Sequence, residues 1–259
     1  MSTILFSDIV YGPIHSRRMG ASLGINLLPF DGKLCNFDCI YCECGFNENF
    51  RTRTKLPTRQ NVKDALKDKL ISMKEEGVVL DVITFAGNGE PTLHPEFAGV
   101  IDDTIELRNT YSPQAKISVL TNGISVVKES VFQSLQKIES PVLKLDSAID
   151  ETVQLIDRPH SPTYTVAKQI ELMKRFKGNF ILQTMFVKGS FEGKIVDNTT
   201  KKELSTWLKV VEELMPREVM IYTIDRETPA KDLEKVSLEV LKEIAAEVEK
   251  LGVRTNVAG

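Results

Sequence analysis

Three cysteines close together in the sequence are the residues with the clearest capacity for chemistry. Cys35, Cys39 and Cys42 follow the spacing Cys-x3-Cys-x2-Cys, and the aromatic Tyr41 directly precedes the third. Cys44 follows two residues later and is the last of the four cysteines in the chain. In a reducing compartment, clustered thiols bind metal or do redox chemistry more often than they form disulfides. The loop is therefore a candidate metal centre.

Two kinds of metal centre suit such a loop. A structural zinc takes four ligands, usually as two pairs from separate segments, and here Cys44, His94 or His160 would have to complete the set. A [4Fe–4S] cluster normally takes four thiolates, so three would leave one iron open to a small molecule. An open coordination position is typical of catalytic metal centres. The spacing favours the iron–sulfur cluster over a protein that only binds zinc.

Apolar runs and amphipathic stretches alternate along the chain and must position this loop. The strands are predicted at 22–28, 80–87, 116–123, 141–148, 179–189 and 218–225, and the helices at 58–77, 95–111, 126–138, 163–176, 200–214 and 237–252. Strict alternation predicts one α/β domain, here residues 1–259, with parallel strands and right-handed crossovers. Both a barrel and an open doubly wound sheet satisfy the pattern.

Polar and glycine-containing segments follow several of these strands. They are the cysteine loop, GNGEP at 87–91, TNG at 121–123, DSA at 146–148 and YTIDR at 222–226. In parallel α/β folds the carboxyl ends of the strands meet at one face, where sites form. We therefore expect these segments to gather around the cysteines.

Within GNGEP, Gly87 and Gly89 allow the backbone to approach a ligand, and Glu90 can accept a hydrogen bond from an ammonium group. Lys144 and Asp146 lie on one side of an otherwise apolar strand, which is costly unless they pair with each other or meet a ligand. Gln183 interrupts another apolar strand, either as a satisfied core amide or as a site residue.

These motifs together resemble the radical S-adenosylmethionine (SAM) superfamily. The resemblance implies a partial (β/α)6 TIM-like barrel. It implies that Cys35, Cys39 and Cys42 hold a [4Fe–4S] cluster whose open iron is chelated by the amino and carboxylate groups of SAM. One electron then cleaves SAM to methionine and a 5′-deoxyadenosyl radical, which abstracts hydrogen from a substrate. The residues that it assigns to SAM are Tyr41 near the adenine, Gly87, Asn88, Gly89, Glu90, Thr121 and Asn122. The strand pattern adds Lys144, Asp146 and Gln183 as candidates for the same site.

Residues from about 10 to 230 look most like the radical SAM group that contains archaeal wyosine (tRNA guanosine) synthases. Those enzymes use a second cluster with cysteines ahead of the signature, whereas this sequence has no cysteine before Cys35. A net charge of -3 also speaks against tRNA as the partner. The hypotheses are therefore hydrogen abstraction from a small-molecule or nucleoside-type substrate, a glycyl-radical-enzyme activase acting on a protein, and a wyosine-synthase-like activity.

The remaining expectations concern location and partners. No apolar stretch is long enough for a membrane span, and the N-terminal residues do not resemble a signal peptide, so we expect a cytoplasmic protein without a membrane partner. The resemblance implies a flavodoxin or ferredoxin as low-potential electron donor. Arg17 and Arg18 are candidates to hold an anionic substrate, with a solvated or ion-paired role as the alternative, and Arg158 is expected to be solvated or ion-paired. Cys44 is expected to be a spectator thiol, with a hydrogen-atom donor role as the alternative.

Overall fold

The computed structural model describes residues 4–16, 20–49 and 54–259. Arg17 and Arg18 therefore lie outside the described residues. One sheet joins all ten strands of the described chain: β1 Val10–Ser16, β2 Gly20–Ile25, β3 Val82–Phe85, β4 Lys116–Thr121, β5 Ser140–Lys144, β6 Ile181–Phe191, β7 Lys194–Asp197, β8 Glu218–Thr223, β9 Leu233–Lys235 and β10 Arg254–Ala258. The helices are α1 Arg59–Glu75, α2 Phe97–Tyr111, α3 Glu129–Gln136, α4 Asp150–Ile156, α5 Val166–Lys174, α6 Lys201–Leu214 and α7 Leu238–Lys250.

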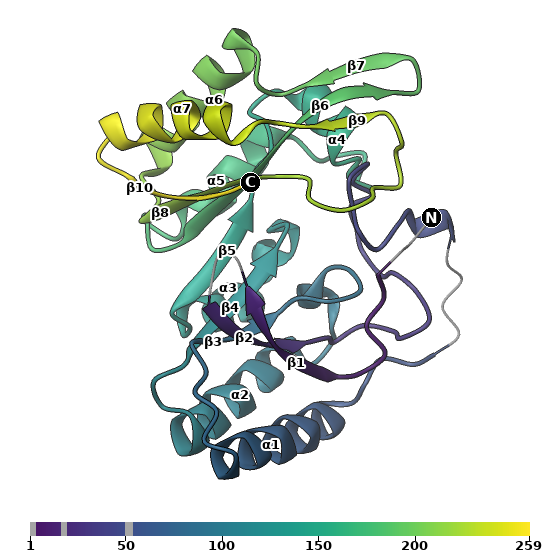
Figure 1. Ribbon diagram of the computed structural model, residues 1–259, viewed down its shortest axis with the longest axis vertical. Helices are drawn as coiled ribbons and strands as arrows, with labels where there is room; N and C mark the ends of the chain where they lie inside the picture. Colours follow the sequence, from purple (N-terminus) through teal and green to yellow (C-terminus); the bar gives the residue numbers. More distant parts are fainter. Residues whose placement is uncertain (1–3, 17–19, 50–53) are drawn as a thin grey trace.

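The strand order is β1-β2-β3-β4-β5-β6-β8-β10, and all neighbours from β2 to β10 are parallel. The sheet does not close, because β1 forms one edge and β10 the other. Figure 1 shows the resulting curved sheet, with α1 and α2 beside its first strands and α6 and α7 beside its last. This confirms the predicted partial barrel. Six parallel strands, β2 to β6 and β8, match the six predicted strand–helix units, and β10 adds a seventh.

Helix α1 shows how the amphipathic pattern produces the outer layer. Its buried residues are Val62, Leu66, Leu70 and Met73, the same four that the helical spacing predicts to face the core. Thr58 begins the helix with a capping box, accepting from the Asn61 amide and donating its own amide to the Asn61 side chain. Each buried aliphatic side chain of this kind stabilises the fold by roughly 1.5–3 kcal/mol.

The strand predicted at 22–28 continues beyond the end of the observed strand β2. Strand β2 ends at Ile25, because the Asn26 side chain accepts from the Leu28 amide at 3.2 Å and turns the chain there. Strand β1 was not predicted, since Pro13 interrupts its apolar pattern. An edge strand tolerates proline, and the register between β1 and β2 shifts between Tyr11 and Ile14.

Three further elements escape the sequence pattern because they are short. Strands β7 and β9 pair antiparallel with the far end of β6, and together they extend the sheet beyond the parallel strands. Helix α4 has seven residues, too few to show a helical period. No helix among the described residues is both long enough and apolar enough to cross a membrane.

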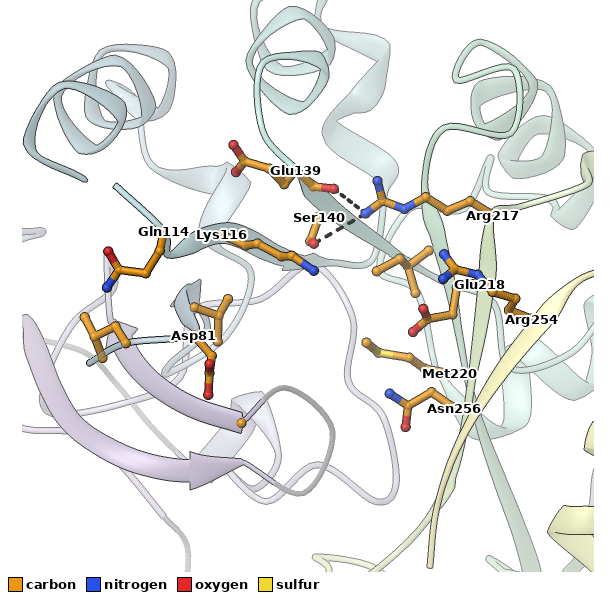
Figure 2. Close-up of a pocket in the computed structure, with 14 residues that line it drawn as sticks. Asp81, Gln114, Lys116, Glu139, Ser140, Arg217, Glu218, Met220, Arg254 and Asn256 are labelled. Carbon is orange, nitrogen blue, oxygen red and sulfur yellow. Dashed lines mark hydrogen bonds between the residues drawn. The ribbon is translucent and has the colours of Figure 1, made fainter. Parts of the chain in front are cut away.

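At the amino ends of the strands lies a cavity of about 680 Å³. Its wall carries both signs of charge, including Asp81, Lys116, Glu218 and Arg254 (Figure 2). Arg217 spans part of it by donating to the Glu139 carbonyl and to Ser140 Oγ. In barrels of this type the amino end of the strands serves stability, whereas chemistry takes place at the opposite end.

Candidate active site around the cysteine loop

The cysteine loop follows β2 and is attached to the body of the protein on two sides. On one side Leu34 pairs with Gly89, through the hydrogen bonds Leu34 N to Asn88 O (2.8 Å) and Glu90 N to Leu34 O (3.0 Å). On the other side Phe37 pairs with Pro159, just after α4. The cysteine and GNGEP motifs, which are about 50 residues apart, are thereby in direct backbone contact, as the strand-end argument predicts.

Gly89 shows why this motif needs glycine. Its φ is +133°, and a Cβ at this position would lie 2.0 Å from the Leu34 carbonyl oxygen. Any larger residue would therefore push the cysteine loop away from the end of β3. Glycine at position 89 therefore allows the GNGEP backbone to pack directly against the backbone of the cysteine loop.

Glu90 is buried, with 3% of its surface exposed, and its carboxylate joins the ends of β3 and β4. It accepts hydrogen bonds from the Thr92 amide (3.1 Å), Thr121 Oγ1 (2.7 Å) and the Asn122 amide (2.8 Å). Burial raises the pKa of this carboxyl, while those donors oppose the shift. The side-chain Nδ2 of Asn122 in turn lies 2.6 Å from Asn36 Oδ1 and 3.9 Å from Cys35 Sγ. Glu90 thus orients Asn122 against the cysteine loop.

Asn88 plays a different part from its neighbours. Its side chain is fully buried, with Oδ1 accepting from the Phe6 amide at 2.8 Å. Its Nδ2 donates to the carbonyls of Phe6 (2.9 Å) and Pro29 (2.8 Å). The Asn88 side chain is therefore engaged with other backbone segments, and only the backbone of this residue faces Leu34.

A buried ionic cluster lies beneath the loop. Lys144 contacts Asp146, Tyr41 and Asp157, the last at 2.7 Å, and Tyr41 donates to Asp146. Burial alone lowers the pKa of Lys144, but Asp146 and Asp157 outweigh it and raise that pKa. Burial and the Asp146 charge raise the pKa of Asp157 to about 8. Lys144 and Asp146 form an ion pair, one of the two alternatives for these residues, and Asp157 is a third member that the sequence pattern did not indicate.

A cavity of about 250 Å³ opens beside this cluster at the carboxyl ends of the strands. Tyr41 and Cys42 form one wall, and Met185, Tyr222 and Arg226 from the β6 and β8 side form the other. An ion pair of 2.7 Å between Glu43 and Arg226 lies at its rim. The cavity therefore joins the third cysteine of the motif to the YTIDR segment.

Lys33 is the site residue that sequence reasoning missed. Its side chain is 1% exposed, and Nζ donates to the Gly45 carbonyl at 2.9 Å and to Asp38 Oδ1 at 3.3 Å. Burial alone lowers the pKa of Lys33, but Cys42, Cys39, Cys35 and Asp38 together raise it. A lone lysine in GKLC has no apolar periodicity around it, so nothing in the pattern marks it as buried.

The remaining candidates from the sequence have different partners in the structure. Gln183 is buried and aligned with Lys144 in the β5–β6 register. His94 bonds to the Pro57 carbonyl at 2.8 Å, whereas His160 lies next to the loop, 2.9 Å from Asn47 Nδ2. Arg158 lies over the rings of Phe46 and Phe191, at 5.2 and 5.3 Å from their centroids.

Three thiols on one loop are the type of donor that an iron–sulfur cluster takes, and their environments differ. Burial raises the pKa of Cys35 to about 12, whereas a hydrogen bond from Cys44 lowers the pKa of Cys42 to about 6. The Phe37 amide donates to Cys35 Sγ at 3.4 Å, and hydrogen bonds to the sulfur ligands help to set the reduction potential of an iron–sulfur cluster. Among the described residues, no three His, Cys, Asp or Glu side chains surround a single point closely enough to enclose one metal ion.

Comparison with known families settles the class. The family description "Radical SAM superfamily" matches residues 31–197, which span the cysteine loop and the strands from β3 to β7. The chain belongs to the radical SAM superfamily. Radical SAM proteins use a [4Fe–4S] cluster and SAM.

Two relatives align over most of this radical SAM chain. A protein named "GTPase Obg" from Brachyspira hyodysenteriae is 31% identical over 242 residues, covering 90% of this chain and 33% of that protein. A UPF0026 protein from Helicobacter pylori is 27% identical over 238 residues, covering 90% of this chain and 72% of its own length. The chain thus spans about a third of the first relative.

Solved structures agree on the radical SAM fold. A radical SAM methyltransferase from Sphaerobacter thermophilus superposes with a TM-score of 0.67 at 16% identity, covering 92% of this chain and 65% of that one. SuiB from Streptococcus suis, solved with bound S-adenosylmethionine, gives 0.64 at 17% identity, covering 90% of this chain and 50% of SuiB. Identities this low speak for the fold alone.

Proposed function

We propose that this protein is an enzyme in which Cys35, Cys39 and Cys42 bind a [4Fe–4S] cluster that takes part in the reductive cleavage of SAM. The observation that supports this most is the direct contact between the cysteine loop and GNGEP at the carboxyl ends of the strands. When bound, the cluster supplies the electron that cleaves SAM to methionine and a 5′-deoxyadenosyl radical. The substrate from which that radical abstracts hydrogen is a separate question.

The chain's own residues would bind and orient SAM. The backbone of Gly87, Asn88 and Gly89, together with Glu90, lies against the cysteine loop, where the methionyl amino group is expected. Thr121 and Asn122 are held beside this segment by hydrogen bonds to Glu90. Tyr41 lines the cavity beside Cys42 and offers an aromatic face for the adenine. We assign Lys144, Asp146 and Gln183 to the adjoining wall, toward the SAM ribose and carboxylate.

We propose two substrate classes, a small molecule and a protein. A glycyl-radical-enzyme activase, which acts on a protein partner, needs one cluster only, and the four cysteines of this sequence suffice for one. A wyosine-synthase-like activity on tRNA is less favoured, because the chain carries a net charge of -3. A flavodoxin or ferredoxin remains the proposed reductant. GTP hydrolysis, suggested by the name of one relative, is not proposed, since the sequence has no G-x4-G-K-[ST] motif.

The test is cleavage of SAM by the reconstituted protein. The anaerobic protein is loaded with iron and sulfide, reduced with dithionite and mixed with SAM, and 5′-deoxyadenosine is measured by mass spectrometry. Cys35→Ala, Cys39→Ala and Cys42→Ala should each abolish the product. Cys44→Ala is the matched control, because it removes a neighbouring thiol of the same loop and should retain both iron and product.

Two results would contradict the proposal. A wild-type protein that binds one zinc and assembles no cluster would assign the loop a structural role. Loss of the cluster in Cys44→Ala, with retention in one of the other three variants, would overturn the assignment of the ligands.

A further inference from the structure

Lys33 lies inside the turn that carries the thiols. Its ammonium group bonds to Asp38, which lies between Cys35 and Cys39, and to the carbonyl of Gly45, which follows the last cysteine. The chain from Asp38 to Gly45 therefore wraps around one buried positive charge. Removing an ammonium group from water is costly, and two good acceptors only offset part of that cost.

The charges near Lys33 do not cancel. Asp38 is shared, since its Oδ1 accepts from Lys33 and from the Asn47 amide at 2.8 Å, while its Oδ2 lies 3.7 Å from Arg158 Nη1. Two cations thus face one carboxylate on this side of the loop. On the other side, Lys144 is balanced by Asp146 and Asp157. Lys33 is therefore the buried cation on the Asp38 side of the thiols, whereas the carboxylate of Glu90 acts on Cys35 from the other side.

We propose that Lys33 is a positioning residue that makes reduction of the cluster more favourable. The inference depends on the proposed function, namely that Cys35, Cys39 and Cys42 hold the cluster. A low-potential one-electron donor would add one negative charge to a cluster held by these thiols, and the thiols act electrostatically on the Lys33 ammonium. A fixed positive charge at short range in a region of low dielectric constant stabilises the reduced form more than the oxidised form.

The experiment measures the midpoint potential of the reconstituted cluster by a redox titration followed by EPR, without SAM or turnover. Lys33→Met removes the charge and keeps an unbranched side chain of similar length. At the wild-type midpoint we expect its ratio of reduced to oxidised cluster to fall at least tenfold, a shift of about 59 mV to lower potential. Lys33→Arg should stay within threefold of wild type, and Lys116→Met, at the amino ends of the strands, is the control for loss of a distant lysine.

Asp38→Asn removes a negative charge beside the thiols, whereas Lys33→Met removes a positive one. It tests the role of Lys33 if Lys33→Met does not assemble a cluster. It keeps an oxygen for the Asn47 amide but removes the negative charge, so its reduced fraction should rise. A loss of packing alone would not move the two variants in opposite directions. Potentials within threefold of wild type in Lys33→Met, or an unchanged or lower reduced fraction in Asp38→Asn, would overturn the inference. A wild-type protein that assembles no cluster would instead overturn the proposed function and this inference with it.

Discussion

At the scale of single residues, the site is built from side chains that hold other parts of the site in place. Glu90 orients Thr121 and Asn122, and Asn122 reaches the cysteine loop at Asn36. Buried polar groups are stabilising only when each has a partner, and Glu90 meets four donors from three residues. The carboxylate is therefore expected to matter for both stability and ligand binding.

Glu90→Gln should reveal both roles. The new amide group must face hydrogen-bond donors where the carboxylate accepted from them, which leaves at least one buried donor unsatisfied. We expect the free energy of unfolding to fall by about 1–3 kcal/mol, measured by urea denaturation. Because Asn122 loses its anchor, SAM affinity measured by calorimetry should also fall, while the iron content is retained.

The control for this variant is Glu75→Gln, which changes an exposed glutamate on α1 and should alter neither quantity. Unchanged SAM affinity in Glu90→Gln, together with the expected loss of stability, would remove the GNGEP segment from the proposed binding site.

At the scale of elements, α1 and α2 are held together by an ion pair as well as by apolar packing. Asp103 of α2 accepts two hydrogen bonds from Arg59, at 2.6 and 2.9 Å, and one from Lys63 at 3.2 Å. A carboxylate held by both arms of a guanidinium has well-defined geometry, which separates this pair from most surface ion pairs. The hydrogen bonds from Arg59 lower the pKa of Asp103, with the Lys63 contact adding to them.

Asp103→Asn should therefore destabilise the fold in a pH-dependent way. At pH 7 we expect the free energy of unfolding to fall by about 1 kcal/mol, because the groups are partly exposed to solvent. The folded pKa lies below the unfolded value of about 3.9, so the stabilisation is complete above that value and is lost as the pH falls through the folded pKa. Urea denaturation from pH 7 down to pH 2 should show the stabilities of wild type and variant converging below about pH 3.9. A difference that stays constant over this range would show that the pair contributes nothing through ionisation.

At the scale of the whole molecule, the two ends of the partial barrel differ in what their polar groups do. The carboxyl end has the thiols, the buried ionic cluster and the cavity beside Cys42. The amino end has the larger cavity, where Arg217 links the start of β8 to that of β5 (Figure 2). The thiols and the larger of these two cavities therefore lie at opposite ends, so the proposed active site is not at the larger cavity.

Arg217→Met should lower stability without changing activity, because it alters only the amino end of the strands. It removes the hydrogen bonds to Glu139 and Ser140, and we expect the free energy of unfolding to fall by about 1 kcal/mol. The rate of 5′-deoxyadenosine formation per bound cluster should stay within twofold of wild type. Loss of product with a normal cluster content would show that the amino end takes part in the reaction.

The sequence by itself determined the class of this protein and the end of the fold at which its motifs meet. The spacing of Cys35, Cys39 and Cys42 is local, and the alternation of strands and helices has its own period, so both can be read without a structure. Strand β1 was missed because Pro13 breaks its pattern, and α4 because it is short. Local reading fails where an element lacks a period.

Only the tertiary structure decided which charged residues are buried at the site. Lys33 and Asp157 have polar or mixed sequence neighbours that do not distinguish them from solvated residues, yet both are buried next to the cysteine loop. The same holds for Gly89, whose need for glycine comes from Leu34, a residue of another segment. A residue's burial and charge partners depend on which crossovers bring distant strand ends together, and that information is spread over the whole chain.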